Sequence, residues 1–532
     1  MQFTIPANTP RKPFNKHWQH CVGSGHAAFA LRRDYTEQLT RIHTELGIQR
    51  VRFHGIFCDD MHTLHRLSDL LPLPGAKKLS EQSFRYCGLA YDNVRRAGMQ
   101  PFVELGFMPK HLAKRQKKGM FFYKPIVSMP KSDAAWAKYI GDFMRYLIRR
   151  YGLDEVRTWF FEVWNEPDLR IAFFDGTQAD YFHLYEITAR AIKAVDNQLM
   201  VGGPATSGSK WVSDFVAFCE KNSVPVDFIT THQYAGDPLG GVQDDTAPAA
   251  GQPKEKAESV FSGINLFRLL NVFKGMEGKT VLEGLRRLMR DPSEEKNIPN
   301  NTFKTNAPIV KRQAKGLPVY FTEWNESAVF SAYTNDTRKV AAYDVKTILD
   351  IENDVTGSSV WCFSDIFEEL HPFPEEFHGG FGMLTQHGIP KPVFHALKML
   401  HMAGGERYDL PGAMDGEISL AAFHSGSEMQ VLLTRQKMKN LDLPKEEATV
   451  SIALPAAPKA LVLNRIDETH CNPLKAWEEM GSTLDLTPAE VEDIKSKTAM
   501  NDEPIEYTYE NGILTFSAAL GVNDVYFTRI TL

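Results

Sequence analysis

Cysteine is scarce in this chain and follows no disulfide or metal-binding pattern. Only six of the 532 residues are cysteines, and no two of them form a CxxC pair. Disulfide-stapled domains and zinc ribbons need denser and more regularly spaced cysteines, so both classes are excluded. We predict that all six are reduced, buried and behave as small hydrophobic residues: Cys21, Cys58, Cys87, Cys219, Cys362 and Cys471.

The chain also lacks long apolar runs and runs of one charge sign. No stretch approaches the ~20 apolar residues of a membrane-spanning helix, and the opening MQFTIPANTPRKPFNKHW has no apolar signal-peptide core. The 60 basic and 66 acidic residues give a formal net charge of −6. This balance argues against nucleic acid or an anionic membrane as the main partner. A cytoplasmic protein is expected.

Short apolar runs alternate with helical patterns over most of the chain. Helical periodicity occurs, for example, at 34–46, 80–98 and 136–151. Eight runs have the β-branched and aromatic content of buried strands: 20–25, 49–55, 100–106, 160–167, 199–205, 227–234, 318–325 and 358–365. Eight strands in β/α order predict an α/β fold, a (β/α)8 TIM barrel over residues 14–404.

Two regions depart from this alternation. A Gly-, Pro- and Asp-rich loop and an amphipathic pattern at 260–270 form an inserted element at about 236–316, which is either an enlarged crossover or a cover for the site. Beyond residue 404, short alternating runs between turn residues are typical of an all-β sandwich. Residues 1–13 plus 405–532 are predicted to form this domain, including a helix at 486–497 that Thr487 caps.

Two glutamates stand at the ends of predicted strands. Glu166 closes the run FFEVWNE, where Pro167 is expected to end the strand, and Glu323 lies in VYFTEWN. Such a glutamate is more commonly a helix cap or an ion-pair partner. However, both lie within two residues of an asparagine and of an aromatic residue, and the catalytic groups of TIM barrels come from several strand ends. The repeated pattern therefore predicts a hydrolase with paired carboxyl groups.

Many motifs follow one another in a defined order: HWQHCVGSG, HGIFCDD, PFVELGFMP, FEVWNEPDL, VGGPA, VPVDFITTHQY, FTEWN, WCFSDIFEE, FHGGFGM, IPKPVFHALKML and RIDETHCNP. Together they resemble glycoside hydrolase family 39, which contains β-xylosidases and α-L-iduronidases. The resemblance covers nearly the whole chain and is greatest to the bacterial β-xylosidases. It implies a retaining, exo-acting hydrolase that releases xylose from the non-reducing ends of β-1,4-xylooligosaccharides by double displacement.

Carried over to this sequence, the resemblance makes Glu166 the acid/base and Glu323 the nucleophile. One carboxyl group protonates the departing oxygen while the other attacks the anomeric carbon, and retaining enzymes hold the two about 5–5.5 Å apart. His232 and Tyr234 lie two apart on one strand, so both can face the site. Tyr234 is expected to orient the nucleophile and Asn165 to bind the sugar 2-hydroxyl. The other expected sugar contacts, several of which ordinary core packing also explains, are His54, Phe121, His232, Trp361, Glu368 and Glu369.

The motifs leave the sugar open. The same machinery could act on an α-L-arabinopyranoside, a β-galactoside, a β-glucoside or an α-L-iduronide, although no basic cluster for a uronate is evident at the strand ends. A catalytically inactive carbohydrate-binding barrel is disfavoured because both carboxylates are present. A metal-dependent barrel hydrolase is disfavoured because the first strand has no HxH pair. The resemblance implies no metal and no cofactor, and tetramers among related proteins suggest a homo-oligomer.

Overall fold

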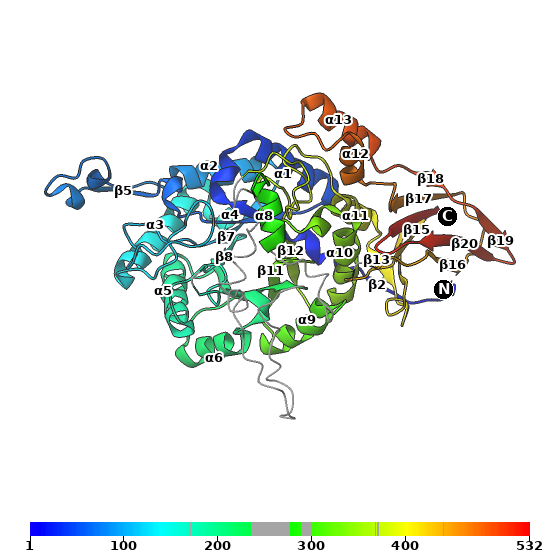
Figure 1. The fold of residues 1–532 in the computed structure, drawn as a ribbon. Coiled ribbons are helices and arrows are strands. Elements are labelled where there is room, and N and C mark those ends of the chain that lie inside the picture. The colour runs from blue at the N-terminus through cyan, green and yellow to red at the C-terminus, as the bar shows by residue number, and fades with distance from the viewer. Residues whose placement is uncertain (171, 236–276, 289–298, 368, 370–371, 440) are drawn as a thin grey trace.

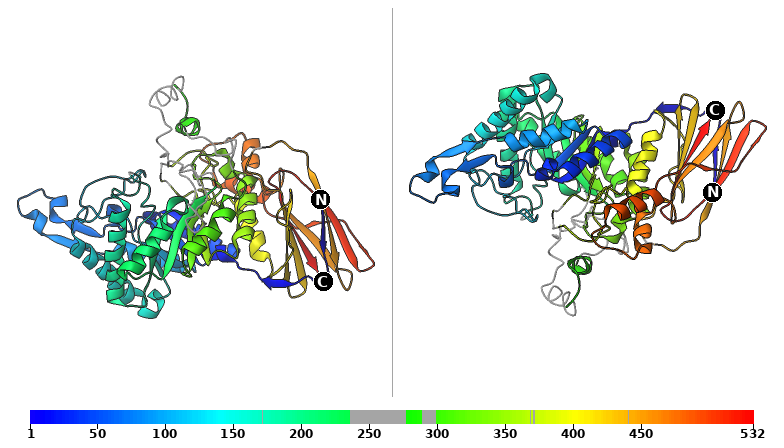
Figure 2. Two further views of the ribbon diagram at one scale, coloured as in Figure 1. Left: turned by 90° about the horizontal axis from the view of Figure 1, so that it is seen from below. Right: turned by 90° about the horizontal axis from the view of Figure 1, so that it is seen from above.

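The computed structural model consists of a closed barrel with a β-rich domain beside it (Figure 1). It describes residues 1–532 except 171, 236–276, 289–298, 368, 370–371 and 440. Both chain ends lie in the β-rich domain, as the views in Figure 2 show. The predicted α/β barrel followed by a β-rich domain is therefore confirmed.

Eight parallel strands form the barrel, and each overlaps a predicted strand, although β8 and β12 end before the predicted runs do. Neighbours follow chain order around the barrel: β3 (Cys21–His26), β4 (Arg50–His54), β7 (Gln100–Glu104), β8 (Phe160–Glu162), β9 (Met200–Thr206), β10 (Phe228–Tyr234), β11 (Val319–Asn325) and β12 (Gly357–Val360). Nearly all of these residues are buried, which explains why the strands read as continuous apolar runs rather than alternating ones.

The two ends of the barrel interior differ in chemistry. Near the strand starts, the rings of Phe102, Phe160, Phe228 and Tyr320 pack against one another with centroids 5.1 to 6.3 Å apart. Stacked and edge-on aromatic contacts of this kind form a dry core. This end is closed by packing, and a reactive site has room only toward the carboxyl ends of the strands.

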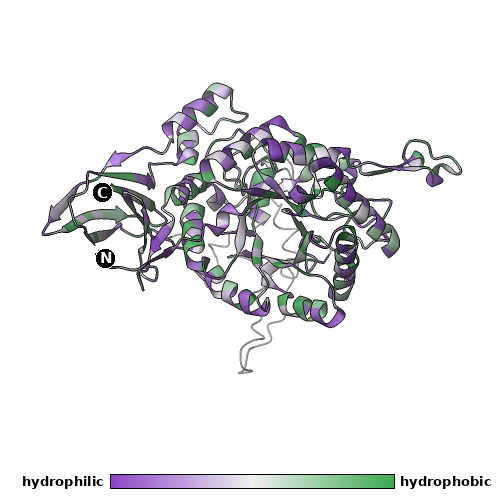
Figure 3. Ribbon diagram, turned by 180° about the vertical axis from the view of Figure 1, so that it is seen from behind, coloured by the Kyte–Doolittle hydropathy of each residue, from purple (hydrophilic) through white to green (hydrophobic). Residues whose placement is uncertain are grey.

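Amphipathic helices surround the barrel, and Figure 3 shows hydrophilic and hydrophobic residues alternating along them. The Ser132 hydroxyl accepts a hydrogen bond from the Ala135 amide and starts the longest of them, while Thr177 and Asp180 form a capping box at another. No helix among the described residues has the length and apolar content of a membrane span. The helices are α1 (Arg33–Leu46), α2 (Arg85–Arg96), α3 (Asp133–Tyr151), α4 (Leu153–Val156), α5 (Gln178–Val195), α6 (Val212–Asn222), α8 (Val281–Leu288), α9 (Thr302–Gln313), α10 (Arg338–Ile351) and α11 (Pro392–Met402).

The region before α2 differs from the prediction. The expected helix at 80–98 begins only at Arg85, because residues 80–82 form strand β6 (Ser80–Gln82), which pairs with β5 (Leu64–Arg66). This hairpin projects from the barrel on the side away from the β-rich domain (Figures 1 and 2). In the predicted inserted element, the amphipathic pattern at 260–270 lies outside the described residues, whereas α8 and α9 are described.

The β-rich domain contains two sheets that share a hydrophobic core, which includes Leu420, Val431, Val450 and Phe516. Neighbouring strands run antiparallel, except that β1 is parallel to β16. One sheet contains β1 (Gln2–Ile5), β16 (Glu446–Ala453), β20 (Ile513–Leu520) and β19 (Tyr507–Glu510). The other contains β18 (Glu503–Pro504), β17 (Ala460–Ile466), β21 (Val525–Thr531), β15 (Glu428–Thr434), β14 (Ser419–Ser425), β13 (Glu406–Tyr408) and β2 (Arg11–Pro13).

Two further features of this domain match the sequence. Helix α13 (Pro488–Lys497) begins after Thr487, which forms a capping box with Glu490, and the shorter α12 (Pro473–Glu479) precedes it. The division of the chain at residues 13 and 404 stays a prediction, which the presence of β1 and β2 in these sheets supports. All six cysteines are free and buried, as predicted.

Candidate active site

Charged side chains fill the barrel interior toward the carboxyl ends of the strands. Arg52, on β4, is fully buried and lies between three carboxylates. Its Nε is 2.5 Å from Glu162 Oε2, its Nη1 is 2.7 Å from Glu323 Oε1, and its Nη2 is 3.1 Å from Glu104 Oε2. Burial opposes the charge, but the three carboxylates raise the pKa of Arg52 above its ordinary value. A permanently charged, planar group therefore fixes the positions of these acids.

Glu323 is held as an anion on β11. Arg52 binds its Oε1, and the Tyr234 hydroxyl donates a hydrogen bond to its Oε2 at 3.0 Å. His54 Nε2 lies 3.5 Å from the same Oε1. Burial raises the pKa of this carboxyl, but His232, Arg52 and His54, together with the Tyr234 hydrogen bond, lower it below its ordinary value overall. An ionised, oriented carboxylate is the form that a nucleophile requires.

Glu166 lies beyond the end of its strand, and this corrects the prediction. Strand β8 ends at Glu162, four residues before Glu166, rather than at Pro167. Trp164 and Glu166 have positive φ values of 74° and 41°, and the Glu166 amide donates a hydrogen bond to the Ala205 carbonyl at 2.8 Å. Left-handed non-glycine residues cost of order 1–3 kcal/mol each and cluster at functional sites. The turn is what carries the Glu166 carboxyl to the site.

His232 lies between the two carboxyl groups. Its Nδ1 is 2.9 Å from Glu166 Oε1 and 3.6 Å from Glu323 Oε2. Tyr234, two residues later on β10, faces the same way, as the strand period predicts. Burial lowers the pKa of His232, so the ring is neutral near pH 7 and forms an ordinary hydrogen bond with Glu166. One carboxyl oxygen of Glu166 and one of Glu323 lie within 4.8 Å of each other.

The spacing of Glu166, His232 and Glu323 would also suit three ligands of one metal ion. The ligand atoms are, however, already engaged within the protein. His232 Nδ1 hydrogen-bonds Glu166, and Arg52 and Tyr234 occupy one oxygen each of Glu323. Proton transfer and nucleophilic attack require carboxyl groups that are oriented by such hydrogen bonds. The contacts therefore favour acid/base and covalent chemistry for this cluster.

His54 and two aromatic side chains form one side of the site. His54 Nδ1 is 2.5 Å from Glu104 Oε2. Its ring stacks with Phe121 at a centroid distance of 5.6 Å and lies 4.8 Å from the ring of Trp361. The structure thus brings together three predicted sugar contacts from β4, from the loop after β7 and, for Trp361, from the residue after β12 rather than from the predicted strand itself.

Asn165, Glu369 and Glu368 complete the predicted set. Asn165 Oδ1 accepts a hydrogen bond from Arg52 Nη2 at 2.9 Å, which fixes the orientation of its amide. Glu369 Oε1 lies 3.9 Å from His54 Nε2. Burial and the charges of Glu323 and two further glutamates raise the pKa of Glu369 well above its ordinary value. Glu368 lies outside the described residues.

Comparison with known proteins identifies the family. The model for "Glycosyl hydrolases family 39" matches residues 1–263 and 289–508. The chain belongs to glycosyl hydrolases family 39. It is 35% identical to a β-xylosidase of Caldicellulosiruptor saccharolyticus over 98% of this chain and 96% of that one. It is 31% identical to a β-xylosidase of Geobacillus stearothermophilus, over 99% and 94%. The resemblance drawn from the motifs is confirmed, and the protein is a glycoside hydrolase.

Comparison with solved structures agrees with the assignment of this enzyme to family 39. A monomeric β-xylosidase from Caulobacter crescentus CB15 superposes with a TM-score of 0.80 at 28% identity, covering 100% of this chain and 99% of the other. The human α-L-iduronidase aligns at 35% identity over only 14% of this chain. In sequence, the β-xylosidases therefore align over nearly the full chain, whereas the iduronidase aligns over a short segment.

The motif analysis missed the charged groups beneath the carboxyl pair of this family 39 enzyme. These are Arg52, Glu104 and Glu162, with Thr322, whose hydroxyl donates a hydrogen bond to Glu162 Oε1 at 2.7 Å. A signal was present: Arg52 lies two residues before His54, so the strand period puts both on the inner face of β4. A fully charged side chain at such a position needs buried partners.

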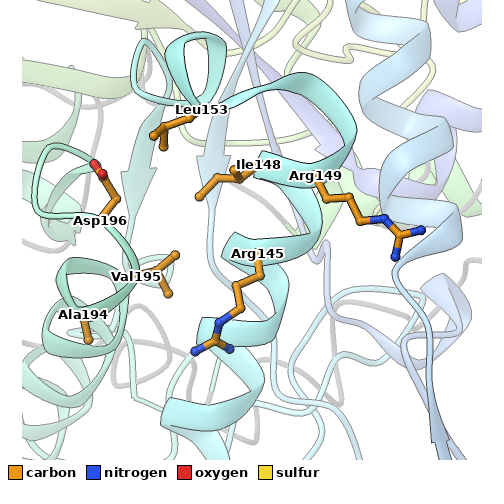
Figure 4. A pocket seen from close by; sticks show the side chains of 7 residues that line it. All are labelled: Arg145, Ile148, Arg149, Leu153, Ala194, Val195 and Asp196. Atoms are coloured by element: carbon orange, nitrogen blue, oxygen red, sulfur yellow. The ribbon is translucent and has the colours of Figure 1, made fainter.

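The outer surface of this family 39 barrel carries a separate groove (Figure 4). Its lining includes Ile148 and Leu153 with the side chains of Arg145, Arg149 and Asp196. These residues belong to α3, to the start of α4 and to the chain after α5. None of the predicted site residues lines this groove.

Proposed function

We propose that this family 39 glycoside hydrolase is a retaining, exo-acting β-xylosidase that releases xylose from the non-reducing ends of β-1,4-xylooligosaccharides. The observation that carries the mechanism is that Glu166 and Glu323 present oxygens within 4.8 Å of each other. This agrees with the short carboxyl separation of retaining enzymes, since inverting enzymes need room for a water between the two groups. Two relatives of nearly full length, at 31% and 35% identity, are β-xylosidases.

In the proposed first step, Glu323 attacks the anomeric carbon while Glu166 gives its proton to the departing oxygen. The glycosidic bond breaks and an ester between the sugar and Glu323 forms. The negative charge of Glu323 is then gone, so ionisation of Glu166 becomes easier. In the second step Glu166 takes a proton from water, which attacks the same carbon, releases the sugar and restores both carboxyl groups.

The surroundings of the site support a neutral sugar rather than a uronate. Arg52, which is buried there, is already shared among three carboxylates. Glu369 and Glu104 lie beside His54. A uronate carboxylate would add negative charge to this acidic group, which is costly in a low-dielectric site. The flat ring of Trp361 suits the apolar face of a pyranose of either kind, so the charge of the surroundings is what favours a neutral sugar.

The loop that carries Phe121 supports cleavage at a chain end. The Phe122 amide donates a hydrogen bond to the Glu369 carbonyl at 2.6 Å, so this loop joins the segment that follows β12. Together with the Phe121 ring against His54, the connection closes one side of the site. A site closed on one side accepts the terminal sugar of a chain rather than an internal one.

A panel of aryl glycosides tests the proposal. The β-xyloside should be turned over fastest among the xyloside, arabinopyranoside, galactoside, glucoside and iduronide, and NMR of the fresh product should show the β anomer. A 2-fluoro xyloside should inactivate the enzyme and label Glu323 in peptide mass mapping. Faster turnover of another glycoside would reassign the sugar, an α-anomeric product would contradict retention, and a label elsewhere would move the nucleophile.

The cellular setting is part of the same proposal. Six free, buried cysteines support a reducing compartment, which agrees with a cytoplasmic enzyme. The reaction as proposed uses only side chains of this chain, without a metal or cofactor. A homo-oligomer is proposed from related proteins, although the Caulobacter crescentus relative is described as monomeric. Light scattering of the purified enzyme decides between these states.

A further inference from the structure

A buried lysine with two aspartates lies beyond the barrel interior. Lys391, directly before α11, is fully buried. Its Nζ is 2.6 Å from Asp336 Oδ1 and 2.6 Å from Asp365 Oδ2, and it donates a hydrogen bond to the Gly380 carbonyl at 3.0 Å. These three partners match the three donors of an ammonium group. The cation is therefore held by two ion pairs and one hydrogen bond from three separate segments.

The same aspartates also hold the loop at 379–382. Asp336 Oδ2 accepts a hydrogen bond from the Gly379 amide at 2.6 Å, and Asp365 Oδ1 accepts one from the Gly382 amide at 2.7 Å. The fit leaves no space. A Cβ on Gly380 would lie 2.3 Å from Asp365 Oδ1, and a Cβ on Gly382 would lie 2.3 Å from the Asp365 amide nitrogen. Lys391 thus fixes both aspartates, and the aspartates fix both ends of this glycine-rich loop.

Phe381, in the middle of the loop, connects it to the aromatic wall of the site. The Cys362 amide donates a hydrogen bond to the Phe381 carbonyl at 3.1 Å, directly after Trp361 in the chain. The Phe381 ring packs edge-on against Phe367 at 5.6 Å, and Phe367 packs edge-on against Trp361 at 5.8 Å. The loop therefore supports Trp361 through both backbone and side-chain contacts.

We propose that Lys391 is a positioning residue that holds Trp361 against the sugar through the loop at 379–382. Stability alone does not account for such a network, because well-packed apolar replacements of buried ion pairs are commonly neutral or stabilising. The paired charges hold the loop in one position, because the ion pairs of Lys391 and the hydrogen bonds of the two aspartates form together in one geometry. The inference rests on the proposed function in one respect, namely that Trp361 contacts the sugar.

Two variants test the role. Lys391→Met removes the cation, whereas Asp365→Asn removes one charge but keeps a carbonyl oxygen for the Gly382 amide. Lys346→Met is the matched control, because Lys346 is another largely buried lysine, paired with Asp350 at 2.5 Å on α10. The measurements are the melting temperature, kcat and KM on the aryl glycoside that the wild type hydrolyses best, and the inhibition constant of the free sugar.

Trp361 would contact the sugar before and during the reaction, so its displacement removes binding that is common to both states. For Lys391→Met we expect KM and the inhibition constant to rise together by about 10-fold, with kcat within about 3-fold of wild type. Asp365→Asn should show the same split to a smaller extent. Lys346→Met should lower the melting temperature without moving either constant.

Unchanged KM and inhibition constants in a folded Lys391→Met protein would overturn the inference, as would equal changes in the control. If Lys391→Met does not fold, Asp365→Asn decides alone, and wild-type constants in that variant overturn the inference. Because the assay uses whichever glycoside the wild type prefers, a different sugar preference would correct the proposed substrate and leave this test intact.

Discussion

Arg52 Nη1 lies 2.7 Å from Glu323 Oε1, and neither side chain is appreciably exposed. A buried carboxylate on its own would take up a proton, because desolvation penalises its charge. The adjacent guanidinium cannot be deprotonated, so it keeps Glu323 ionised at a pH where the acid/base must hold its proton. Arg52 thus lets Glu323 be ionised while the acid/base, a few ångströms away, holds its proton.

Arg52→Lys should shift the acid limb of the kcat/KM profile to higher pH. The limb reports the ionisation of Glu323, whose pKa Arg52 lowers, and a lysine cannot reproduce the fork that contacts several carboxylates. The pKa of Glu323 should therefore rise. When the pH is lowered, the variant should lose activity at a higher pH than the wild type does. Arg50→Lys, at the start of the same strand over the ring of Phe160, is the control and should leave the limb in place. An unmoved limb in Arg52→Lys would reject this account of the ionisation.

Tyr234→Phe should lower kcat/KM by about 10- to 100-fold, since a hydrogen bond to a charged group contributes roughly 1.5–3 kcal/mol. The hydroxyl donates to Glu323 Oε2, opposite the oxygen that Arg52 holds. Its loss should also raise the pKa of Glu323 and move the acid limb in the same direction as Arg52→Lys. Tyr320→Phe alters a tyrosine of the aromatic cluster near the strand starts and should retain wild-type kinetics. Comparable losses in both variants would point to general destabilisation.

Much of the barrel could be predicted from the sequence because its strands are buried on both faces. Runs such as FITTHQY stand out from the amphipathic helices around them, and all eight were located. The end of β8 was placed too late. The apolar run continues to Trp164, but the backbone there takes a positive φ of 74°, which aromatic residues rarely adopt and local propensity does not predict.

The strand period was enough to predict that His232 and Tyr234 face the same way, and the structure places both beside the carboxyl pair. The buried charged residues that position the site were not predictable. Lys391 meets Asp336 and Asp365 only after the chain has folded, and nothing local to any of the three marks the others as partners. Buried charge networks depend on long-range contacts, which single-sequence patterns do not contain.

Glu369→Gln and Glu369→Ala should differ. Burial and the charge of Glu323 raise the pKa of Glu369, so it should hold a proton where Glu323 is ionised and can donate a hydrogen bond to a sugar hydroxyl. Glutamine keeps a donor and similar volume, whereas alanine leaves the hydroxyl without a partner. We expect KM on the aryl xyloside to change little for Gln and to rise about 3- to 10-fold for Ala, the cost of one hydrogen bond. Equal losses in Gln and Ala would show that a neutral donor at this position does not replace Glu369, and would contradict the protonated form.

Glu166→Ala should separate the acid role from the nucleophile role through the leaving group. For xylobiose, whose departing alkoxide is strongly basic, glycosylation should slow by about 10²- to 10⁴-fold, the usual contribution of general acid catalysis. A dinitrophenyl xyloside needs no proton on its leaving group, so its first step should be nearly unaffected. Deglycosylation still lacks its base, and stopped-flow measurements should therefore show a burst followed by slow turnover.

Azide provides the decisive check on Glu166→Ala. It is small enough for the space that the carboxyl vacates beside His232 Nδ1, and as an anion it attacks without a base. Azide should accelerate the slow phase with the dinitrophenyl substrate and yield the β-azide, because attack on the ester of Glu323 inverts the anomeric carbon a second time. Glu323→Ala is the matched control, and azide there can attack only the intact substrate, which gives the α-azide. Equal losses on both substrates without azide rescue would mean that Glu166 is not the acid/base, and the carboxyl within 4.8 Å of Glu323 would need another role.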